Sequence, residues 1–124
     1  MIDTQVLVWL YGGQQKRIPR AVQRRLNREQ LGVSPFVMLE LTYLYEIRRA
    51  TTPAQTVIDE LGARMALIVA DISALTVCNA AAGITWTRDP FDRLIAAHAV
   101  ASGMTLVTRD ETIRQHLPLA WWSD

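Results

Sequence analysis

The sequence holds little of several features, and each scarcity excludes a class of protein. It has one cysteine, Cys78, so no disulfide can form within the chain. Cys78 stands among apolar residues, and we expect it to be a small buried side chain in a reducing compartment. No run approaches the ~20 apolar residues of a membrane-spanning helix. No basic and apolar start typical of a signal peptide is visible, so a cytoplasmic protein without membrane contact is expected.

Lysine is nearly absent as well, because Lys16 is the only lysine among 13 basic residues. Arginine makes two-pronged contacts to phosphate and carboxylate groups, so this bias suits a phosphate-rich or acidic partner, and genomic composition would also produce it. The net charge of +1 gives no overall signature of a protein that binds polyanions. Hydrophobic residues make up 50% of the 124 and charged residues 20%, which predicts a single domain over residues 1–124 with a real core.

One segment concentrates positive charge on a single side. A helix is expected to begin near Pro19 and to turn Val22 and Leu26 toward the core. Its basic residues share another side at three- and four-residue steps: Arg17, Arg20, Arg24 and Arg28. A solvated charged face is the commoner explanation of such a pattern, and a binding surface is the alternative.

Short apolar segments alternate with helical ones along the chain. Strands are expected at residues 1–2, 31–34, 67–70, 104–107 and 119–122. Helices are expected between them, including an opening helix that Gly12 ends and helices over residues 36–49, 54–65, 73–82 and 111–116. Strands separated by helices predict an α/β fold with a parallel sheet and helices on both faces.

The most informative stretch runs from Arg88 to Ala99. Asp89 stands where a helix N-cap belongs, and Pro90 occupies the first helical position, where its missing N–H costs nothing. Asp92 falls in the first turn, at the positive end of the helix dipole, and Gly103 ends the helix. Taken alone, the stretch is explained equally well by capping.

Three other acids change this interpretation. Asp3 and Asp110 each follow a strand, at the sheet edge where α/β proteins form their sites. Glu40 has only apolar or aromatic helical neighbours, so it is either exposed at the edge of its face or paired with an arginine or a metal ion. Several carboxylates converging with Asp92 would need a cation, and all-oxygen ligands select Mg²⁺ or Mn²⁺. Such an ion activates water, so the chemistry implied is hydrolysis of a phosphate ester.

The chain resembles the PIN-domain ribonucleases, and within them the VapC-type toxins of bacterial toxin–antitoxin modules. The matching pieces are Asp3-Thr4 with the apolar run that follows, Glu40 in its apolar helix, the run Arg88-Asp89-Pro90-Phe91-Asp92-Arg93-Leu94, and Leu106-Val107-Thr108-Arg109-Asp110. They stand in family order and span nearly the whole chain. The Asp-Pro-Phe-Asp-Arg run and the Thr-Arg-Asp strand end are the most specific.

The resemblance implies a PIN-like three-layer α/β/α fold with a central, mostly parallel sheet of four to five strands. It implies that Asp3, Glu40, Asp92 and Asp110 form a catalytic, metal-binding quartet for Mg²⁺ or Mn²⁺, with Thr4, Asp89 and Thr108 supporting it. The implied activity is endonucleolytic cleavage of RNA by water. The implied partners are an RNA substrate, a cognate VapB-type antitoxin that occludes the acidic site, and a second copy in a homodimer. The alternative is a non-catalytic PIN-like module that binds RNA or protein.

Several further residues carry weaker expectations. Arg88, Arg93 and Arg109 flank the acids, where they would either meet RNA phosphates or simply lower carboxylate repulsion. Asp71 is expected to cap the helix at residues 73–82, and a packed or exposed role is favoured for His98 over a catalytic base. His116 is expected at the surface. Trp121 and Trp122 should point to opposite faces of the last strand, with one of them in the core.

Overall fold

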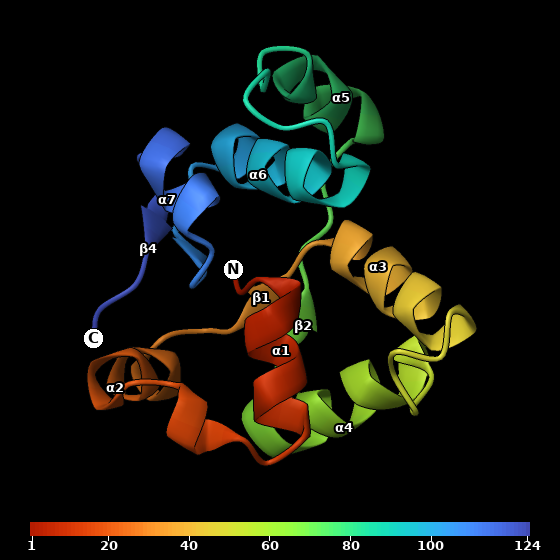
Figure 1. The fold of residues 1–124 in the computed structure, drawn as a ribbon, viewed down its shortest axis with the longest axis vertical. Coiled ribbons are helices and arrows are strands. Elements are labelled where there is room, and N and C mark those ends of the chain that lie inside the picture. The colour runs from red at the N-terminus through yellow and green to blue at the C-terminus, as the bar shows by residue number, and fades with distance from the viewer.

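A computed structural model describes the whole chain, residues 1–124 (Figure 1). The helices are α1 (Thr4–Tyr11), the 3-10 helix η1 (Gln15–Arg17), α2 (Arg20–Arg28), α3 (Pro35–Glu46), α4 (Ala54–Met65), α5 (Ala74–Ala81), α6 (Pro90–Ser102) and α7 (Glu111–His116). The strands are β1 (Gly32–Val33), β2 (Ile68–Val69), β3 (Leu106–Val107) and β4 (Ala120–Trp121). The expected helices over residues 54–65 and 111–116 are confirmed to the residue.

The start of the chain forms the centre of the sheet. β1 pairs with β2 and β3 pairs with β4, both in parallel register. Ile2 joins the two pairs, because its N–H donates to the carbonyl of Gly32 at 2.9 Å and it bridges Val107 in parallel. The order across the sheet is therefore β2, β1, the segment 1–3, β3 and β4. The predicted α/β architecture, with a parallel sheet of four to five strands, is confirmed.

Polar residues at the ends of the central strands start the helices that follow. Asp3 caps α1 by accepting from the N–H of Thr4, Ser34 caps α3 by accepting from Phe36, and Asp110 caps α7 by accepting from Ile113. Each cap pairs an N–H that the first helical turn leaves without a backbone partner. Three helix starts are thus collected at one edge of the sheet.

The helices enclose one hydrophobic core of 29 buried residues. In Figure 1, α6 lies between α5 and α3, and α4 lies at the opposite end of the molecule from α5. α5 packs against α6, while α3 packs against both α4 and α6. Gly103 ends α6 with φ +64°, a left-handed conformation that glycine adopts without strain.

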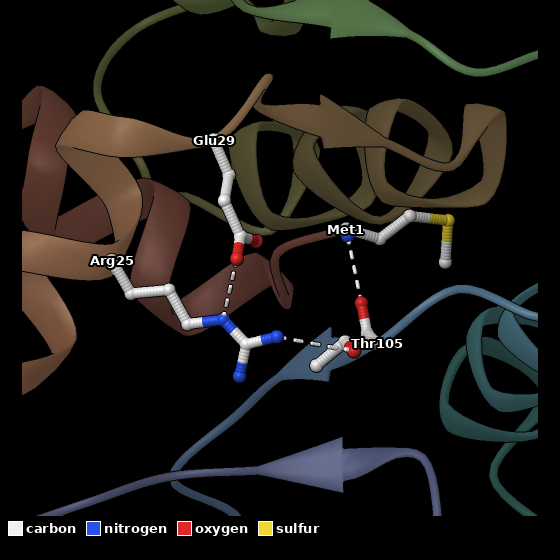
Figure 2. Close-up of polar contacts among 4 residues, drawn as sticks. All are labelled: Met1, Arg25, Glu29 and Thr105. Carbon is white, nitrogen blue, oxygen red and sulfur yellow. Dashed lines mark hydrogen bonds and ion pairs between the residues drawn. The ribbon is translucent and has the colours of Figure 1, made fainter.

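A polar cluster ties α2 to the sheet, at the edge away from the helix caps (Figure 2). Arg25 Nε forms an ion pair with Glu29 at 3.0 Å, and its Nη2 donates to the hydroxyl of Thr105 at 3.4 Å. The amino group of Met1 donates to the carbonyl of Thr105 at 2.8 Å. The Arg25 guanidinium also lies 4.5 Å from the centre of the Trp121 ring. Arg25 is therefore occupied in holding α2 in place.

Some expectations were wrong. Cys78 is exposed on α5 rather than buried, because the neighbour that faces α6 is Val77. Asp71 does not cap α5, since Ser73 is the N-cap and no side-chain hydrogen bond is made there. The helix expected over residues 36–49 ends at Glu46, because the chain turns through Arg48 at φ +63°.

The aromatic and histidine expectations had mixed outcomes. Trp121 and Trp122 are both half-buried, so neither is a core residue, and Trp122 packs against Trp9 at a ring separation of 6.3 Å. His116 is exposed, as expected, and stacks on Trp86 at 5.1 Å. His98 is buried, and its Nδ1 lies 2.8 Å from the hydroxyl of Ser34. The packed role favoured for His98 is confirmed.

The lengths and compositions of the helices bear on whether the chain could cross a membrane. None of them combines the length and the apolar character that a bilayer crossing requires.

The Ser34–His98 pair gives a test of the fold. Ser34→Ala removes the α3 cap and leaves His98 Nδ1 unpaired, while His98 Nε2 already lacks a partner. We expect the free energy of unfolding in urea to fall by about 2–3 kcal/mol. Ser73→Ala, at an N-cap with no side-chain hydrogen bond, is the matched control and should cost under about 0.5 kcal/mol. Equal losses in the two variants would contradict the assignment.

Candidate active site

The four predicted acids line one open cleft at the carboxyl edge of the sheet. Its volume is about 510 Å³, and its lining residues are Asp3, Thr4, Gln5, Val8, Trp9, Arg17, Glu40, Leu44, Asp92, Arg109 and Asp110. They come from the segment 1–3, α1, η1, α3, α6 and the segment after β3. The structure thus brings together acids that lie up to 107 positions apart in the chain, from Asp3 to Asp110.

Asp3 is the most buried of the four and is held from two sides. Its Oδ1 accepts from the N–H of Thr4 at 2.7 Å, and its Oδ2 accepts from the hydroxyl of Thr108 at 2.6 Å. The Thr108 hydroxyl in turn accepts from the N–H of Asp110 at 3.0 Å. One buried threonine therefore fixes the position of Asp3 relative to the segment that carries Asp110.

Glu40 is positioned by the other threonine. The hydroxyl of Thr4 donates to Glu40 Oε1, so the first residue of α1 connects to the middle of α3. Glu40 is half-buried, and no arginine forms an ion pair with it. Pairing with an arginine is therefore ruled out for Glu40, and its side chain is only partly exposed at the edge of its helix face.

Asp92 differs from its neighbours because no protein group donates a hydrogen bond to its carboxylate. It lies in the first turn of α6, three residues after the cap residue Asp89, which accepts from the N–H groups of Phe91 and Asp92 at 3.0 and 2.9 Å. Asp89 itself is exposed and lies outside the cleft lining. Asp92 therefore lines the cleft with a carboxylate that has no hydrogen-bond partner in the protein.

The electrostatics of the cleft disfavour charge on three of these acids. Burial, followed by the charges of Asp89, Asp3, Glu40 and Asp110, raises the pKa of Asp92 to about 7. Burial is also the main reason why the pKa values of Asp3 and Glu40 are raised, although threonine hydroxyls donating to both oppose the change. The cleft is therefore a site where added positive charge would be stabilising.

The donor set of the cleft suits a hard divalent cation. Only oxygen ligands are present, with no histidine or cysteine in the lining. As they stand, no three acidic side chains lie close enough together to hold one ion. Mg²⁺ is commonly held by one or two carboxylates, with waters and substrate phosphates completing its shell, so a cage of three is not required. The free oxygens of Asp92 fit this kind of site.

The flanking arginines separate into different roles. Arg109 lines the cleft and lies 5.9 Å from the centre of the Trp9 ring. Arg93 points elsewhere, because its Nε donates to the carbonyl of Ala81 at the end of α5. Arg88 is exposed and outside the lining. The side chain of Arg93 joins α6 to α5, a role that neither expectation for this residue named.

Sequence reasoning missed Arg17 and Trp9 as cleft residues. Arg17 was grouped with the arginines of α2, but it belongs to η1, which ends two residues before the N-cap of α2. Trp9 was part of the apolar run after Asp3 and gave no signal of its own. Trp9 follows Gln5 by four residues on α1, so the two share a helix face, but nothing in the sequence marked that face as part of the cleft.

The raised pKa of Asp92, caused first by burial and then by the neighbouring charges, predicts how stability depends on pH. With a folded-state pKa near 7 and an ordinary value of 3.8, Asp92 keeps its proton in the folded protein after the unfolded chain has lost it. In EDTA, the free energy of unfolding should therefore fall as pH rises from about 4 to about 7. Asp92→Asn should raise stability by about 1 kcal/mol at about pH 8, a value reduced for solvent screening, and should have little effect below about pH 4.

Urea unfolding at the two pH values measures this effect. Asp59→Asn, at an exposed position of α4 outside the cleft, is the matched control and should leave the pH dependence unchanged. A destabilised Asp92→Asn protein at about pH 8 would show that the helix dipole outweighs the repulsion.

Known proteins similar to this chain share both its sequence pattern and its fold. Ribonuclease VapC22 of Mycobacterium tuberculosis (strain ATCC 25618 / H37Rv) is 29% identical over 120 residues, which cover 94% of this chain and 90% of the relative. The crystal structure of VapBC2 from Rickettsia felis, bound to a DNA fragment from their promoter, matches with a TM-score of 0.67 and 21% identity over 99% of this chain and 98% of that one. The VapBC-1 structure from nontypeable Haemophilus influenzae matches with a TM-score of 0.68 and 18% identity over 100% and 96%.

The two structural matches confirm the predicted PIN-like α/β/α fold, and the resemblance to VapC-type proteins is confirmed with them. The PIN domain sequence pattern matches residues 1–116, which include all four acids of the cleft. The chain therefore belongs to the PIN domain family.

Proposed function

We propose that this protein is a metal-dependent endoribonuclease, the toxin of a VapBC-type module, acting on RNA in the cytoplasm. The observation that carries the proposal is the cleft in which Asp3, Glu40, Asp92 and Asp110 meet. Support comes from the similarity to Ribonuclease VapC22 along nearly the whole of both chains. The non-catalytic alternative requires these acids to be structural, and Asp92 makes no structural contact through its carboxylate.

Asp92, Glu40, Asp3 and Asp110 are the residues that would hold Mg²⁺ or Mn²⁺. A bound ion of this kind lowers the pKa of a coordinated water and stabilises charge developing on a phosphoryl oxygen. The chain's own part is to keep the ligands in place: Thr108 holds Asp3, and Thr4 holds both Asp3 and Glu40. Arg109 and Arg17 line the same cleft and would draw an RNA phosphate toward it.

A VapB-type antitoxin is the partner proposed for the surface beside the cleft. A second groove of about 470 Å³ runs between α1, α3 and the start of α4, and half of its 12 lining residues are hydrophobic. It shares Gln5, Val8 and Leu44 with the acidic cleft, so the two form one continuous depression. A segment lying in the groove would reach the acids and block access to them.

A homodimer is proposed as well. Leu39, Tyr43 and Ile47 form an exposed apolar stripe on and just beyond α3, at four-residue steps. The Tyr43 ring lies 5.7 Å from that of Phe91, so the stripe extends toward the start of α6. A second copy of the chain would remove this apolar surface from water.

The activity is tested with the purified chain, free of antitoxin, on a pool of structured RNA. We expect cleavage with Mg²⁺ or Mn²⁺, none in EDTA, and a loss of about 100-fold or more in Asp92→Asn, which keeps the shape of the side chain but removes its charge. Asp59→Asn is the control and should cleave normally. Equal cleavage by the wild type and Asp92→Asn would refute the assignment of the site. A folded protein that cleaves nothing in this pool would favour the binding module.

The supporting threonines make a separate prediction. Thr108→Val keeps the shape of the side chain but removes the hydroxyl that holds Asp3, so activity should fall about 10–100-fold. Thr108→Ser restores the hydroxyl and should recover most of that loss. Thr112→Val, at an exposed position of α7, is the matched control. Failure of the serine variant to recover activity would mean that packing, rather than the hydrogen bond, is what matters at residue 108.

A further inference from the structure

Positive charge is gathered in one short segment of this nearly neutral chain. Six of its 13 basic residues lie between residues 16 and 28: Lys16, Arg17, Arg20, Arg24, Arg25 and Arg28. No acidic residue occurs between Asp3 and Glu29. The rest of the molecule must therefore be net negative, and the segment stands out as a separate electrostatic feature.

Five of these six side chains are free. Arg25 forms the ion pair with Glu29 and the contacts to Thr105 and Trp121 described above. The other five are exposed and make no hydrogen bond, ion pair or cation–π contact; they are defined here as the basic face: Lys16, Arg17, Arg20, Arg24 and Arg28. Figure 1 shows α2 on the opposite side of α1 from α3.

The arrangement works against the stability of α2. Arg20, Arg24 and Arg28 follow one another at four-residue steps, and like charges at this spacing repel. Arg20 also occupies the first helical position, where the helix dipole favours an acid, and the first turn contains none. The dipole favours Arg28 in the last turn, but no acidic side chain pairs with Arg20, Arg24 or Arg28, and a bound polyanion would relieve their repulsion.

The basic face leads into the acidic cleft. Arg17 lines the cleft together with Arg109, and Lys16 precedes it on η1. Pro19 then leads directly into α2 and its row of arginines. A chain of phosphates that enters the cleft at Arg17 would meet the remaining arginines in sequence along the helix.

We propose that the basic face binds the backbone of single-stranded RNA and guides it into the cleft. The proposal rests on the proposed ribonuclease function and names the surface that holds the substrate beyond the cut bond. Arginine suits phosphate and carboxylate alike, so RNA is favoured over an acidic protein because the face ends at a site suited to phosphodiester hydrolysis. Contacts of this kind hold any sequence, so target choice must come from elsewhere.

The salt dependence of RNA binding tests the proposal. Binding of fluorescein-labelled oligouridylate is followed by anisotropy in EDTA, which prevents consumption of the RNA by the metal-dependent reaction. We expect Arg24→Gln/Arg28→Gln to lower the slope of log K against log salt by about 1.4, and to weaken binding about tenfold near physiological salt. Both arginines are outside the cleft, so residues of the proposed active site stay intact.

Arg48→Gln/Arg64→Gln is the matched control, because it removes the same charge from exposed positions outside α2. It should leave the slope and the affinity unchanged. Circular dichroism should show that both double variants fold, with the melting temperature of Arg24→Gln/Arg28→Gln unchanged or raised, since repulsion within α2 is relieved.

An equal change in both double variants, or in neither, would overturn the proposal. Binding of fluorescein-labelled poly-glutamate, followed in the same way, tests the acidic-protein alternative. If Arg24→Gln/Arg28→Gln loses poly-glutamate binding while its RNA binding stays intact, the proposal is overturned and the face is assigned to an acidic protein. If the wild type cleaves RNA but the salt dependence of RNA binding is unaffected by the substitutions at Arg24 and Arg28, the role proposed for the basic face is wrong and the proposed function stands. If the wild type neither binds nor cleaves RNA, both fail.

Discussion

The pairing of residues 1–3 with β1 on one side and β3 on the other is the interaction on which the molecule depends. The N–H of Ile2 donates to Gly32 on one side, and on the other side the N–H of Asp3 donates to Val107 and that of Val107 donates to Met1. Without these hydrogen bonds, two separate strand pairs remain. The same pairing brings three strand ends together, and each leads directly into a helix cap. Because Asp3 is at once the last residue of the central segment and the cap of α1, the fold and the site share a residue.

The sequence was most informative where local chemistry decides the structure. Caps such as Asp89 and stops such as Gly103 depend on neighbours in the chain, so the bounds of α6 could be predicted. Burial depends on which face of a helix meets another helix, and for the short, small-residue helix α5 nothing in the pattern separated Cys78 from Val77. The four acids could be gathered by the resemblance and by the rule of strand ends. Arg17 could not, because its role depends on how η1 turns after Gly13, at φ +69°.

The charged acids of the cleft lower the stability of the folded protein. Three carboxylates have raised pKa values, and the largest cause for each is burial, with mutual repulsion added. The two threonines reduce this penalty for Asp3 and Glu40 by donating hydrogen bonds to the charged form. They leave Asp92 uncompensated. A fold that needed these acids only as caps would keep Asp3 and Asp110, which accept backbone N–H groups. A charge at residue 92 would bring such a fold only its interaction with the dipole of α6, which burial and the neighbouring charges oppose.

This asymmetry bears on the choice between an enzyme and a binding module. Asp3, Glu40 and Asp110 each accept a hydrogen bond that a structural role would explain, so their presence together is compatible with both. Asp92 accepts none, lies among other acids, and faces a cleft that two arginines also line. A module that only bound RNA would be weakened by a carboxylate there, since the carboxylate repels phosphate. A cation held between the carboxylate and the phosphate would turn this repulsion into attraction, and the proposed reaction would then account for the position of Asp92.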